Sequence, residues 1–382
     1  MRRAICCFVL VVIATSYGAT RVRADDGEDE VDWNPDRTHV FCVGLLQWER
    51  EDIYASFPAC MVDRRDEQLV ARFREAGVPD DQITYLQDAQ ATKAAIQEAF
   101  KRTLDETDEG DLLIFYFCGH GSRDPDSNKT WFANYDAGDA YSSAWGVHEI
   151  IDTIEARFGG DRVLLLADCC HSGALYDEVR SRRETDIAYA VFTSSYAHNT
   201  STGNWTYSDC LLAALDGDPR VDLDGNGTVN LQELAHYGEL ELAFVEGQKS
   251  MFLATKEFPR RTRIATTDGE VTPRVGLRIE VEFNDRWYRA ESIDADGDQL
   301  EVHYVHADDA TDEWVGPERV RPYHPAQFAE GDAVEVKWET DGEWYPARVL
   351  RAWYGLHMVR YDGFDQDSDE WVGPQSIRLR TE

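Results

Sequence analysis

The chain has 382 residues, with 73 acidic side chains (Asp and Glu) against 38 basic ones (Lys and Arg), which gives a net charge of −35 at neutral pH. A protein of this charge is repelled by a phosphate backbone, so the composition argues against nucleic-acid binding. The hydrophobic fraction of 43% is sufficient for packed cores and excludes wholesale disorder. Eight cysteines are too few for a disulfide-dense scaffold, and the length indicates two or three domains.

The N-terminal residues have the form of a secretory signal peptide. Arg2 and Arg3 precede an apolar run over residues 4–15, and Val22-x-Ala24 has the small residues of a cleavage site. We therefore expect a signal peptide at residues 1–24, an acidic linker at 25–37, and a secreted or periplasmic protein without a membrane span once the signal is removed. An uncleaved membrane anchor is the alternative, for which the apolar run is short.

Strands and helices alternate from residue 38 to about residue 258. Strands that are apolar throughout and separated by helices are typical of a parallel sheet covered on both faces. In chain order we expect a strand at 39–46, a helix at 67–76, a strand at 83–86, a helix from the N-cap Thr92 to Leu104, a strand at 112–117, a helix at 147–158, and strands at 163–167 and 188–193.

An internal repeat begins near residue 272. Trp287-Tyr288 recurs 57 positions later as Trp344-Tyr345, and the hexapeptide Asp-Glu-Trp-Val-Gly-Pro occurs at 312–317 and again at 369–374. A constant offset across separate matches indicates two copies of one unit. Because each copy alternates apolar and polar residues over short runs, we expect two small antiparallel barrels, at 272–323 and 328–380.

Two of the predicted strands end in residues suited to nucleophilic catalysis. The strand at 112–117 runs into Cys118-Gly119-His120-Gly121, and the strand at 163–167 runs into Asp168-Cys169-Cys170-His171-Ser172-Gly173. Both ends lie at the same edge of a parallel sheet, where an imidazole can activate a thiol. The backbone amides of Gly121 and Cys170 are candidate oxyanion donors.

These two motifs resemble the histidine and cysteine signatures of metacaspases, within the caspase-like cysteine peptidases. The resemblance covers residues 38–258 and implies a caspase-like, mostly parallel sheet flanked by helices, followed here by the two all-β barrels. It implies that Cys170 is the nucleophile and His120 the general acid/base, with Cys169 in the preceding, non-catalytic position. His171 is then a structural histidine.

The resemblance also implies a preference for substrates with a basic residue before the cleaved bond. Metacaspases line this specificity pocket with acidic residues, which match Asp168 and, in the segment Ala59-Cys60-Met61-Val62-Asp63, the carboxylate of Asp63. Two carboxylates favour a guanidinium through charge and paired hydrogen bonds. The alternative for Asp63 is that it caps the following helix.

Residues 222–233 satisfy a complete EF-hand calcium-loop pattern. Asp222, Asp224 and Asn226 would supply side-chain oxygens, Thr228 its carbonyl and Glu233 a bidentate carboxylate. We expect Ca²⁺ as cofactor, in a structural or an activating role, and no organic cofactor. The alternative is an acidic turn that binds nothing.

The barrel repeats are similar to the Tudor, chromo-barrel and agenet group of SH3-like barrels. That resemblance implies aromatic cages for cationic groups, with Trp287, Tyr304 and Trp314 as candidates in the first copy. Their counterparts in the second copy are Trp344, Tyr361 and Trp371. The alternative is that these aromatics form the barrel cores. We expect the barrels to dock a cationic peptide.

The sequence therefore predicts a secreted, calcium-binding cysteine endopeptidase that cleaves basic peptides or proteins after Arg or Lys. Two alternatives stay open: an inert caspase-like scaffold that binds peptides through its barrels, and a transferase or ligase that uses the same Cys-His chemistry. The basic run at residues 180–183 is either a self-processing site or an exposed loop. The disulfide pairing of the remaining cysteines stays open.

Overall fold

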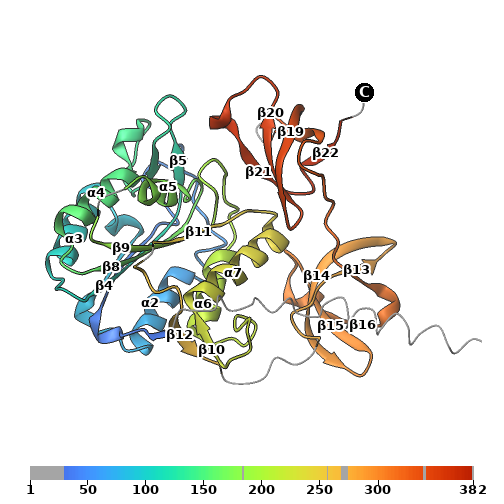
Figure 1. The fold of residues 1–382 in the computed structure, drawn as a ribbon, viewed down its shortest axis with the longest axis horizontal. Coiled ribbons are helices and arrows are strands. Elements are labelled where there is room, and N and C mark those ends of the chain that lie inside the picture. The colour runs from blue at the N-terminus through green and yellow to red at the C-terminus, as the bar shows by residue number, and fades with distance from the viewer. Residues whose placement is uncertain (1–29, 183–184, 256, 268–273, 339–340, 381–382) are drawn as a thin grey trace, which may run out of the picture.

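The computed structural model describes residues 30–182, 185–255, 257–267, 274–338 and 341–380. An α/β domain is followed by two β-barrels. In Figure 1 the first barrel (orange) lies beside α6 (Thr206–Leu215) and α7 (Leu231–Glu241) of this domain, and the second barrel (red) lies above the first. The predicted signal peptide and residues 25–29 of the predicted linker lie outside the described residues. Within the described ranges, no helix is both long and apolar enough to traverse a lipid bilayer.

A six-stranded sheet forms the centre of the first domain. Its order is β11-β9-β8-β4-β2-β3, and the last five of these strands are parallel, while β11 is antiparallel to β9. The strands are β2 (Thr38–Gly44), β3 (Ile83–Gln87), β4 (Leu112–Cys118), β8 (Arg162–Asp168), β9 (Ala188–Thr193) and β11 (Met251–Ala254). The five parallel strands confirm the predicted fold class.

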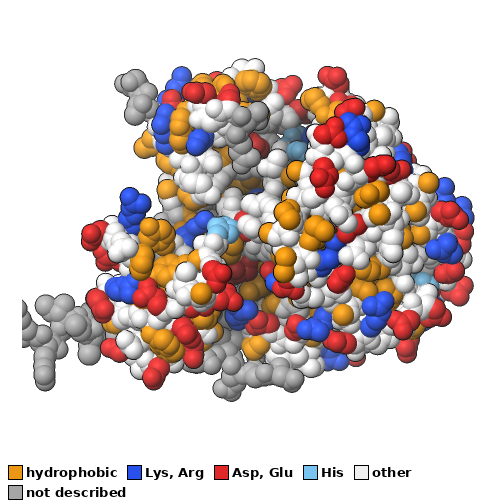
Figure 2. Space-filling view, turned by 180° about the vertical axis from the view of Figure 1, so that it is seen from behind, with side chains coloured by type: hydrophobic (Ala, Val, Ile, Leu, Met, Phe, Trp, Pro, Cys, Tyr) orange, Lys and Arg blue, Asp and Glu red, His pale blue; other side chains and the backbone are white. Residues whose placement is uncertain are grey.

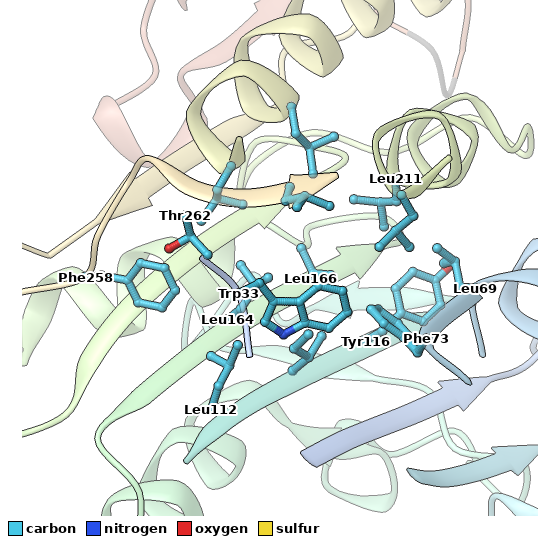
Figure 3. A pocket seen from close by; sticks show the side chains of 15 residues that line it. Trp33, Leu69, Phe73, Leu112, Tyr116, Leu164, Leu166, Leu211, Phe258 and Thr262 are labelled. Carbon is cyan, nitrogen blue, oxygen red and sulfur yellow. The ribbon is translucent and has the colours of Figure 1, made fainter. Parts of the chain in front are cut away.

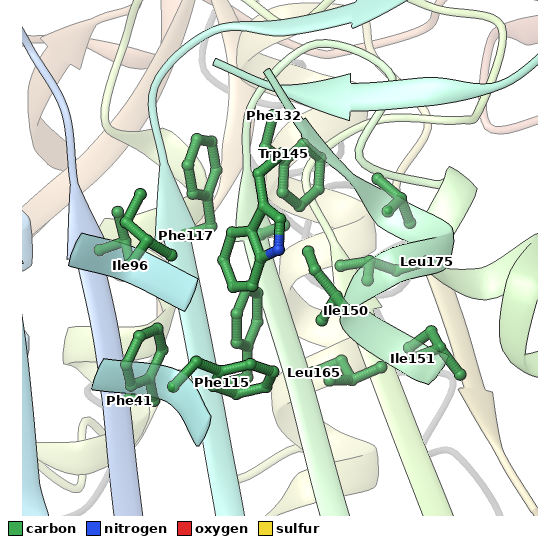
Figure 4. Close-up of a cluster of buried hydrophobic side chains, with 14 of the residues drawn as sticks. Phe41, Ile96, Phe115, Phe117, Phe132, Trp145, Ile150, Ile151, Leu165 and Leu175 are labelled. Carbon is green, nitrogen blue, oxygen red and sulfur yellow. The ribbon is translucent and has the colours of Figure 1, made fainter. Parts of the chain in front are cut away.

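Helices cover both faces of this sheet. On one face lie α3 (Lys93–Asp105), α4 (Val147–Arg157) and α5 (Ala174–Ser181), and on the other lie α2 (Arg65–Glu75), α6 (Thr206–Leu215) and α7 (Leu231–Glu241). Successive side chains of a strand point to opposite faces, so Phe41 packs in the first core and Val40 in the second. Figure 4 shows the first core, in which Trp145 lies among Phe41, Phe115 and Phe117.

Two small sheets complete the domain. One joins β1 (Val31–Asp32), β12 (Thr262–Thr266) and β10 (Thr228–Asn230), and the other joins β5 (Gly121–Arg123), β6 (Thr130–Phe132) and β7 (Trp145–Gly146). The sequence placed residues 31–37 in the linker, but β1 pairs with β12 and a short 3-10 helix, η1, follows at Pro35–Arg37. The domain accordingly extends past residue 258, because β12 provides the partner for both β1 and β10.

Each C-terminal repeat folds as a five-stranded antiparallel sheet, as predicted. The first contains β13 (Arg278–Phe283), β14 (Arg286–Asp296), β15 (Gln299–Tyr304), β16 (Glu313–Val315) and β17 (Val320–Pro322), and the second contains β18 (Ala333–Lys337), β19 (Trp344–Trp353), β20 (Leu356–Tyr361), β21 (Glu370–Val372) and β22 (Ile377–Leu379). Inward-facing residues form a separate small core in each barrel.

The first barrel docks on the end of α7, where the chain continues as a short π-helix, η5 (Leu242–Glu246). Arg278 of the barrel pairs with Glu241, and Glu291 pairs with Arg220 at 3.0 Å. The rings of Phe244 and Tyr323 meet edge to face, with centroids 5.0 Å apart. In the space-filling view of Figure 2, acidic and basic side chains are interspersed over the visible face.

Trp33 closes the second core from the N-terminal side. It lines a small apolar cavity of about 60 Å³ together with side chains of α2, β4, β8, α6 and α7 (Figure 3). Its ring meets Phe73 edge to face at 6.2 Å, and its Nε1 donates a hydrogen bond to Thr38 Oγ1 at 2.8 Å. The segment assigned to a linker thus contributes to the core.

We expect Trp33→Ala to lower the free energy of unfolding of the α/β domain by about 3 kcal/mol, because it enlarges an apolar cavity and removes a partly buried ring that packs against the core. Urea unfolding followed by circular dichroism measures this loss. The matched control is Val31→Ala, whose side chain is exposed; we expect it to change stability by less than about 0.5 kcal/mol. Equal effects of the two substitutions would contradict the role given to Trp33.

Candidate functional site

The register of the parallel strands brings the two predicted catalytic loops to one place. Gly44 of β2 pairs with Cys118 of β4, and Cys118 pairs with Asp168 of β8, so these strands end at the same level. His120 and Cys170 each lie two residues beyond that level on neighbouring strands. Both line one cavity of about 120 Å³ at this edge of the sheet.

An aromatic cluster holds the imidazole of His120. The ring centroids of Trp48, Phe57 and Tyr54 lie 4.5, 4.6 and 5.6 Å from that of His120. Burial lowers the pKa of His120, and a hydrogen bond with the Ala55 carbonyl opposes this shift. The ring is therefore neutral at pH 7, where it can accept a proton.

The hydrogen bond to Ala55 also determines which ring nitrogen is available as a base. Nε2 lies 2.8 Å from the Ala55 carbonyl oxygen, which can only accept, so we assign the proton to Nε2. Nδ1 of the neutral ring then carries the lone pair.

Cys169 and Cys170 are neighbours in sequence but have different environments. Cys169 is 2% exposed and packs in the first core, and burial, more than the nearby Cys170 and Asp168, raises the pKa of its thiol well above the usual value. Cys170 is half-buried and lines the cavity, and the Ser201 amide donates a hydrogen bond to its Sγ at 3.2 Å. The same sulfur donates to the Ser201 carbonyl at 3.7 Å, so one residue orients it through both its amide and its carbonyl. Because its side chain is half-buried and that of Cys169 is buried, Cys170 is the sulfur that a substrate can reach.

Gly121 permits the close approach of the two loops. A Cβ at this position would lie 1.8 Å from the Cys170 carbonyl oxygen, so any larger residue would push the loops apart. The contact brings the backbone of Gly121 next to that of Cys170. That the amides of Gly121 and Cys170 donate to the oxyanion stays a prediction, and the closeness of the two backbones is consistent with it.

Asp168 lies beside the thiol and the imidazole, in the wall of the same cavity. It is 9% exposed, and Ser208 Oγ donates to its Oδ2 at 2.7 Å. Burial is the main cause that raises the pKa of Asp168 to about 7; hydrogen bonds from Ser208 and Ser194 oppose the shift, and the charges of Asp209 and Glu246 add to it. A cationic group that enters the cavity would stabilise the ionised form.

Asp63 does not line this cavity. Its side chain is 66% exposed, pairs with Arg65 and accepts a hydrogen bond from Gln68 Nε2 at 2.5 Å. Arg65 also pairs with Asp209, so a guanidinium of this chain lies between the two carboxylates. The role of Asp63 in the pocket therefore stays a prediction. The alternative that it caps α2 is not supported either, because its partners are the side chains of Arg65 and Gln68 and the N-cap of α2, Arg64, makes no side-chain cap hydrogen bond.

Several residues of the site carry no sequence motif. Cys60, Ser201, Thr202, Asn204 and Trp205 line the cavity. The segment 201–205 comes from the loop after β9, whose length and composition contain no catalytic pattern. Only its position after a parallel strand could have indicated a role.

His171 faces away from the catalytic cavity. Its backbone has a positive φ of 58°, and its Nδ1 lies 3.0 Å from the Ala197 carbonyl oxygen. Burial lowers its pKa, with the same carbonyl opposing the shift. It lines a separate cleft toward the second barrel. These contacts agree with the structural role expected of it.

The predicted calcium loop has a shape that fits the ion. Ligand oxygens of Asp222, Asp224 and Glu233 all lie within 4.8 Å of one another. Asp222 accepts hydrogen bonds from the amides of Gly225, Asn226 and Gly227, at 2.8 to 3.1 Å, which curl the loop around its carboxylate. Three converging carboxylates on such a turn would supply part of the roughly six to eight oxygens that Ca²⁺ takes.

The remaining groups of this loop extend the ligand set. Asn226 Oδ1 accepts from the Thr228 amide at 2.8 Å, which places both predicted ligands on the same turn. Burial is the main cause that raises the pKa of Glu233 to about 7. The helix after the loop, α7, begins at Leu231, because Thr228–Asn230 forms β10 and pairs with β12.

A second cluster with metal-binding residue types lies in the first barrel, at His303, Asp309 and Asp312. The repeat identifies it as an ion pair. His303 Nδ1 lies 2.8 Å from Asp312, and the residues 57 positions later, Arg360 and Asp369, form the same pair at 2.8 Å. An arginine cannot bind a metal, so the shared feature is electrostatic.

Each barrel has a cluster of aromatic rings that contains one of its three predicted cage residues, Tyr304 or Tyr361. Phe283, Tyr288 and Tyr304 cluster in the first barrel, with ring centroids 6.3 and 6.4 Å apart, and Trp338, Tyr345 and Tyr361 cluster in the second. The guanidinium groups of Arg321 and Arg378 instead cover the predicted cage residues Trp287 and Trp344, at 4.1 and 4.0 Å. A pocket of about 820 Å³ opens at the first aromatic cluster.

Comparison with known families agrees with these observations. Residues 66–179 match the family model described as metacaspase, peptidase C14 domain, and residues 276–325 and 331–382 match the Agenet domain model. The chain carries a metacaspase-type peptidase domain and two Agenet domains.

Individual proteins resemble parts of the chain. Metacaspase-7 of Arabidopsis thaliana is 28% identical over 129 residues, which are 32% of this chain and 31% of the relative, so the chain spans about a third of that curated relative. Protein GSU0716 from Geobacter sulfurreducens is 15% identical, with a TM-score of 0.42 over 61% of this chain and 100% of that chain. The tandem Agenet domain 3-4 of ADCP1 is 20% identical, with a TM-score of 0.14 over 28% of this chain and 80% of that chain.

The raised pKa of Asp168 gives the peptidase domain an expected pH dependence. We expect the ratio of kcat/KM for an arginine peptide over its citrulline analogue to increase roughly tenfold as pH rises through about 7, because the carboxylate that attracts the cation forms above this pKa. Cys170 and His120 act on both peptides alike, so any pH effect on these two residues changes both kcat/KM values equally and drops out of the ratio.

Asp168→Asn is the matched variant for this measurement, since it keeps the shape of the side chain. We expect its ratio to be small and independent of pH. A ratio that still rises with pH in Asp168→Asn would assign the titration to a group other than Asp168.

Proposed function

We propose that this protein is a cysteine endopeptidase that uses Cys170 and His120 and cleaves after Arg or Lys. The observation that carries the proposal is that Cys170, His120 and Asp168 line one cavity at the ends of adjacent parallel strands. The metacaspase family match supports a caspase-like protease. The basic specificity rests on Asp168 in the cavity wall.

In the proposed reaction, Nδ1 of His120 takes the proton of the Cys170 thiol, and the sulfur attacks the carbonyl carbon of the scissile bond. The oxyanion that forms accepts hydrogen bonds from the Gly121 and Cys170 amides. His120 then donates its proton to the leaving amine, which gives an acyl-enzyme. Water, deprotonated by His120, attacks this thioester and releases the new carboxyl terminus.

The aromatic cluster around His120 supports this role. It packs against the ring in the lining of the cavity and partly shields it from water, and this burial lowers the pKa of the imidazole and favours its neutral form before the thiol is deprotonated. The Ala55 carbonyl orients the ring and can stabilise the imidazolium that forms after proton transfer.

We expect Cys170→Ala to reduce hydrolysis of Arg- and Lys-terminated fluorogenic peptides by at least about a thousandfold, since the nucleophile is lost. Cys169→Ala is the matched control and should retain activity within about threefold, because that thiol is buried in the core. Peptides ending in Asp or Leu should be poor substrates. Hydrolysis that survives Cys170→Ala would remove the mechanism.

The open alternatives use the same experiment. An inert scaffold predicts no hydrolysis of any peptide and no labelling of Cys170 by thiol-reactive peptide probes. A transferase or ligase predicts products in which an added amine replaces water, which mass spectrometry detects. The aromatic pocket of the first barrel favours peptide binding as an additional function, because its aromatic faces suit a cationic side chain. The carboxylates of Glu280 and Glu313 in the same pocket are paired with Arg321 and Arg319.

Export and self-processing are also part of the proposal. The signal peptide lies outside the described residues, so export rests on the sequence pattern. In the basic run, Arg180 and Ser181 belong to α5, and Arg182 is paired with Asp152 at 2.8 Å and with Glu155 at 3.3 Å. Cleavage there requires this end of the helix to open first.

We propose that the loop at 222–233 binds Ca²⁺. We expect saturating Ca²⁺ to raise the Tm of the full chain by about 3 °C or more, because an ion that binds only the folded state stabilises it. Glu233→Gln should abolish the rise, and Asp294→Asn, an exposed acid in the first barrel, should leave it unchanged. A rise of equal size in Glu233→Gln would place the ion elsewhere; activity measured with and without Ca²⁺ separates structural from activating roles.

A further inference from the structure

A large cleft separates the peptidase domain from the second Agenet barrel. Its volume is about 800 Å³, and its walls come from the loop after β9 and from β21 with the turns beside it. Ser201 and Thr202 line both this cleft and the catalytic cavity. The amide of Ser201 also donates to the Cys170 sulfur, so the cleft adjoins the catalytic cavity at the residue that contacts this sulfur.

The barrel wall of the cleft is held by specific hydrogen bonds. The side-chain amide of Asn199 donates to the Trp371 carbonyl at 2.7 Å and accepts from the Trp371 amide at 3.2 Å. Asn199 thereby occupies the outer edge of β21 as a further strand residue would. Its own carbonyl accepts from the His171 amide at 2.9 Å, so the barrel is linked to the residue after Cys170.

A second contact fixes the same wall. Asn128 Nδ2 donates to Asp367 Oδ2 at 3.1 Å, and a Cβ on Gly373 would lie 3.0 Å from the Gly247 carbonyl oxygen. The first barrel has no equivalent position in the described structure: Trp314, the counterpart of Trp371, is 41% exposed.

Acidic groups predominate in the cleft. The second barrel contributes Asp365, Asp367 and Glu370 against Lys337, and the peptidase domain contributes Arg123. Glu246 also belongs to the wall, but its carboxylate is 1% exposed and accepts hydrogen bonds from Asn204 and Thr206. The two histidines of the wall, His171 and His198, have pKa values lowered mainly by burial and are neutral at pH 7. Trp371 and Trp338, the latter 40% exposed, offer aromatic faces to the stems of long cationic side chains.

We propose that the second Agenet barrel is part of the substrate-binding site, and that the cleft holds a run of Lys and Arg residues that flanks the cleaved bond in an extended substrate. This inference rests on the proposed peptidase function. It assigns the second barrel to substrate selection at Cys170, whereas the first barrel, whose aromatic pocket shares no lining residue with the catalytic cavity, acts separately.

Binding to an inactive full-length chain tests the cleft without relying on catalysis. In a Cys170→Ala background, fluorescence anisotropy measures the affinity of labelled peptides of about a dozen residues. Every peptide has one central Arg. The first carries three additional Lys residues on the N-terminal side of this Arg, the second carries them on the C-terminal side, and in the control peptides these Lys residues are replaced by Glu. We expect tighter binding for Lys on one of the two sides and the weakest binding for Glu.

The cleft variant is Asp365→Asn with Asp367→Asn. Asparagine keeps the oxygen with which Asp365 caps the short helix η8 (Gln366–Ser368), so the turn is retained. The matched control is Asp294→Asn with Asp296→Asn, which makes the same charge change at exposed positions of the first barrel. We expect roughly fivefold weaker binding of the Lys-rich peptide for the cleft variant at low salt, and no more than about 1.5-fold for the control.

The corresponding kinetic experiment uses the chain with Cys170 intact. The ratio of kcat/KM for the Lys-rich peptide over a blocked peptide with a single Arg should fall roughly fivefold in the cleft variant and remain constant in the control. Trp338→Ala and Phe283→Ala, structurally equivalent and both exposed, provide a second pair in which only the former should lower the ratio.

The outcomes separate the two proposals. Equal losses in the cleft variant and its control, or no preference for Lys over Glu, would overturn the inference while leaving the peptidase proposal intact if Cys170-dependent cleavage persists. Cleft-dependent binding without any cleavage would support the cleft as a cationic peptide site and refute the peptidase.

Discussion

The chemistry of this protein depends on the register of three neighbouring parallel strands. Gly44, Cys118 and Asp168 are paired across β2, β4 and β8, so the loops that follow leave the sheet at the same level. A shift of one residue in any of these pairings would turn the strand's buried side chains to the opposite face. The two cores on the faces of the sheet therefore hold the register, and with it the relative position of His120 and Cys170.

Burial then gives nearby groups of similar type different properties. Cys169 and Cys170 are adjacent in the chain and both border the cavity, but Cys169 is 2% exposed and packs in the core, whereas Cys170 is half-buried. Asp168 and Asp63 are both carboxylates that the family pattern assigns to one pocket, yet only Asp168 is buried, with a pKa raised to about 7. Position relative to water, more than residue type, decides which group takes part in the chemistry.

The two Agenet domains have similar sequences but contact different parts of the α/β domain. The first barrel packs on the end of α7 through Arg278 and Glu241, away from the catalytic cavity. The second barrel meets the loop after β9 through Asn199, one of the segments that line the cavity. The predicted calcium loop leads into α7, whose last residue, Glu241, pairs with the first barrel. The α/β domain thus contacts the first barrel through the helix that follows this loop, and the second barrel through the loop after β9.

The sequence by itself determined the α/β class, the two barrels, the cysteine and histidine motifs and the calcium-loop pattern, because hydrophobic periodicity, the repeat and motif spacing are local properties of the chain. Only the tertiary structure decided that Asp63 pairs with Arg65 outside the cavity, that Val31 and Trp33 belong to the fold, and that Ser201 reaches the nucleophile. It likewise decided that Arg321 and Arg378 cover Trp287 and Trp344, two of the six expected cage residues. Apart from the Asp63–Arg65 pair, each of these results is a contact between segments far apart in sequence, and no local pattern encodes which distant surface a side chain will meet.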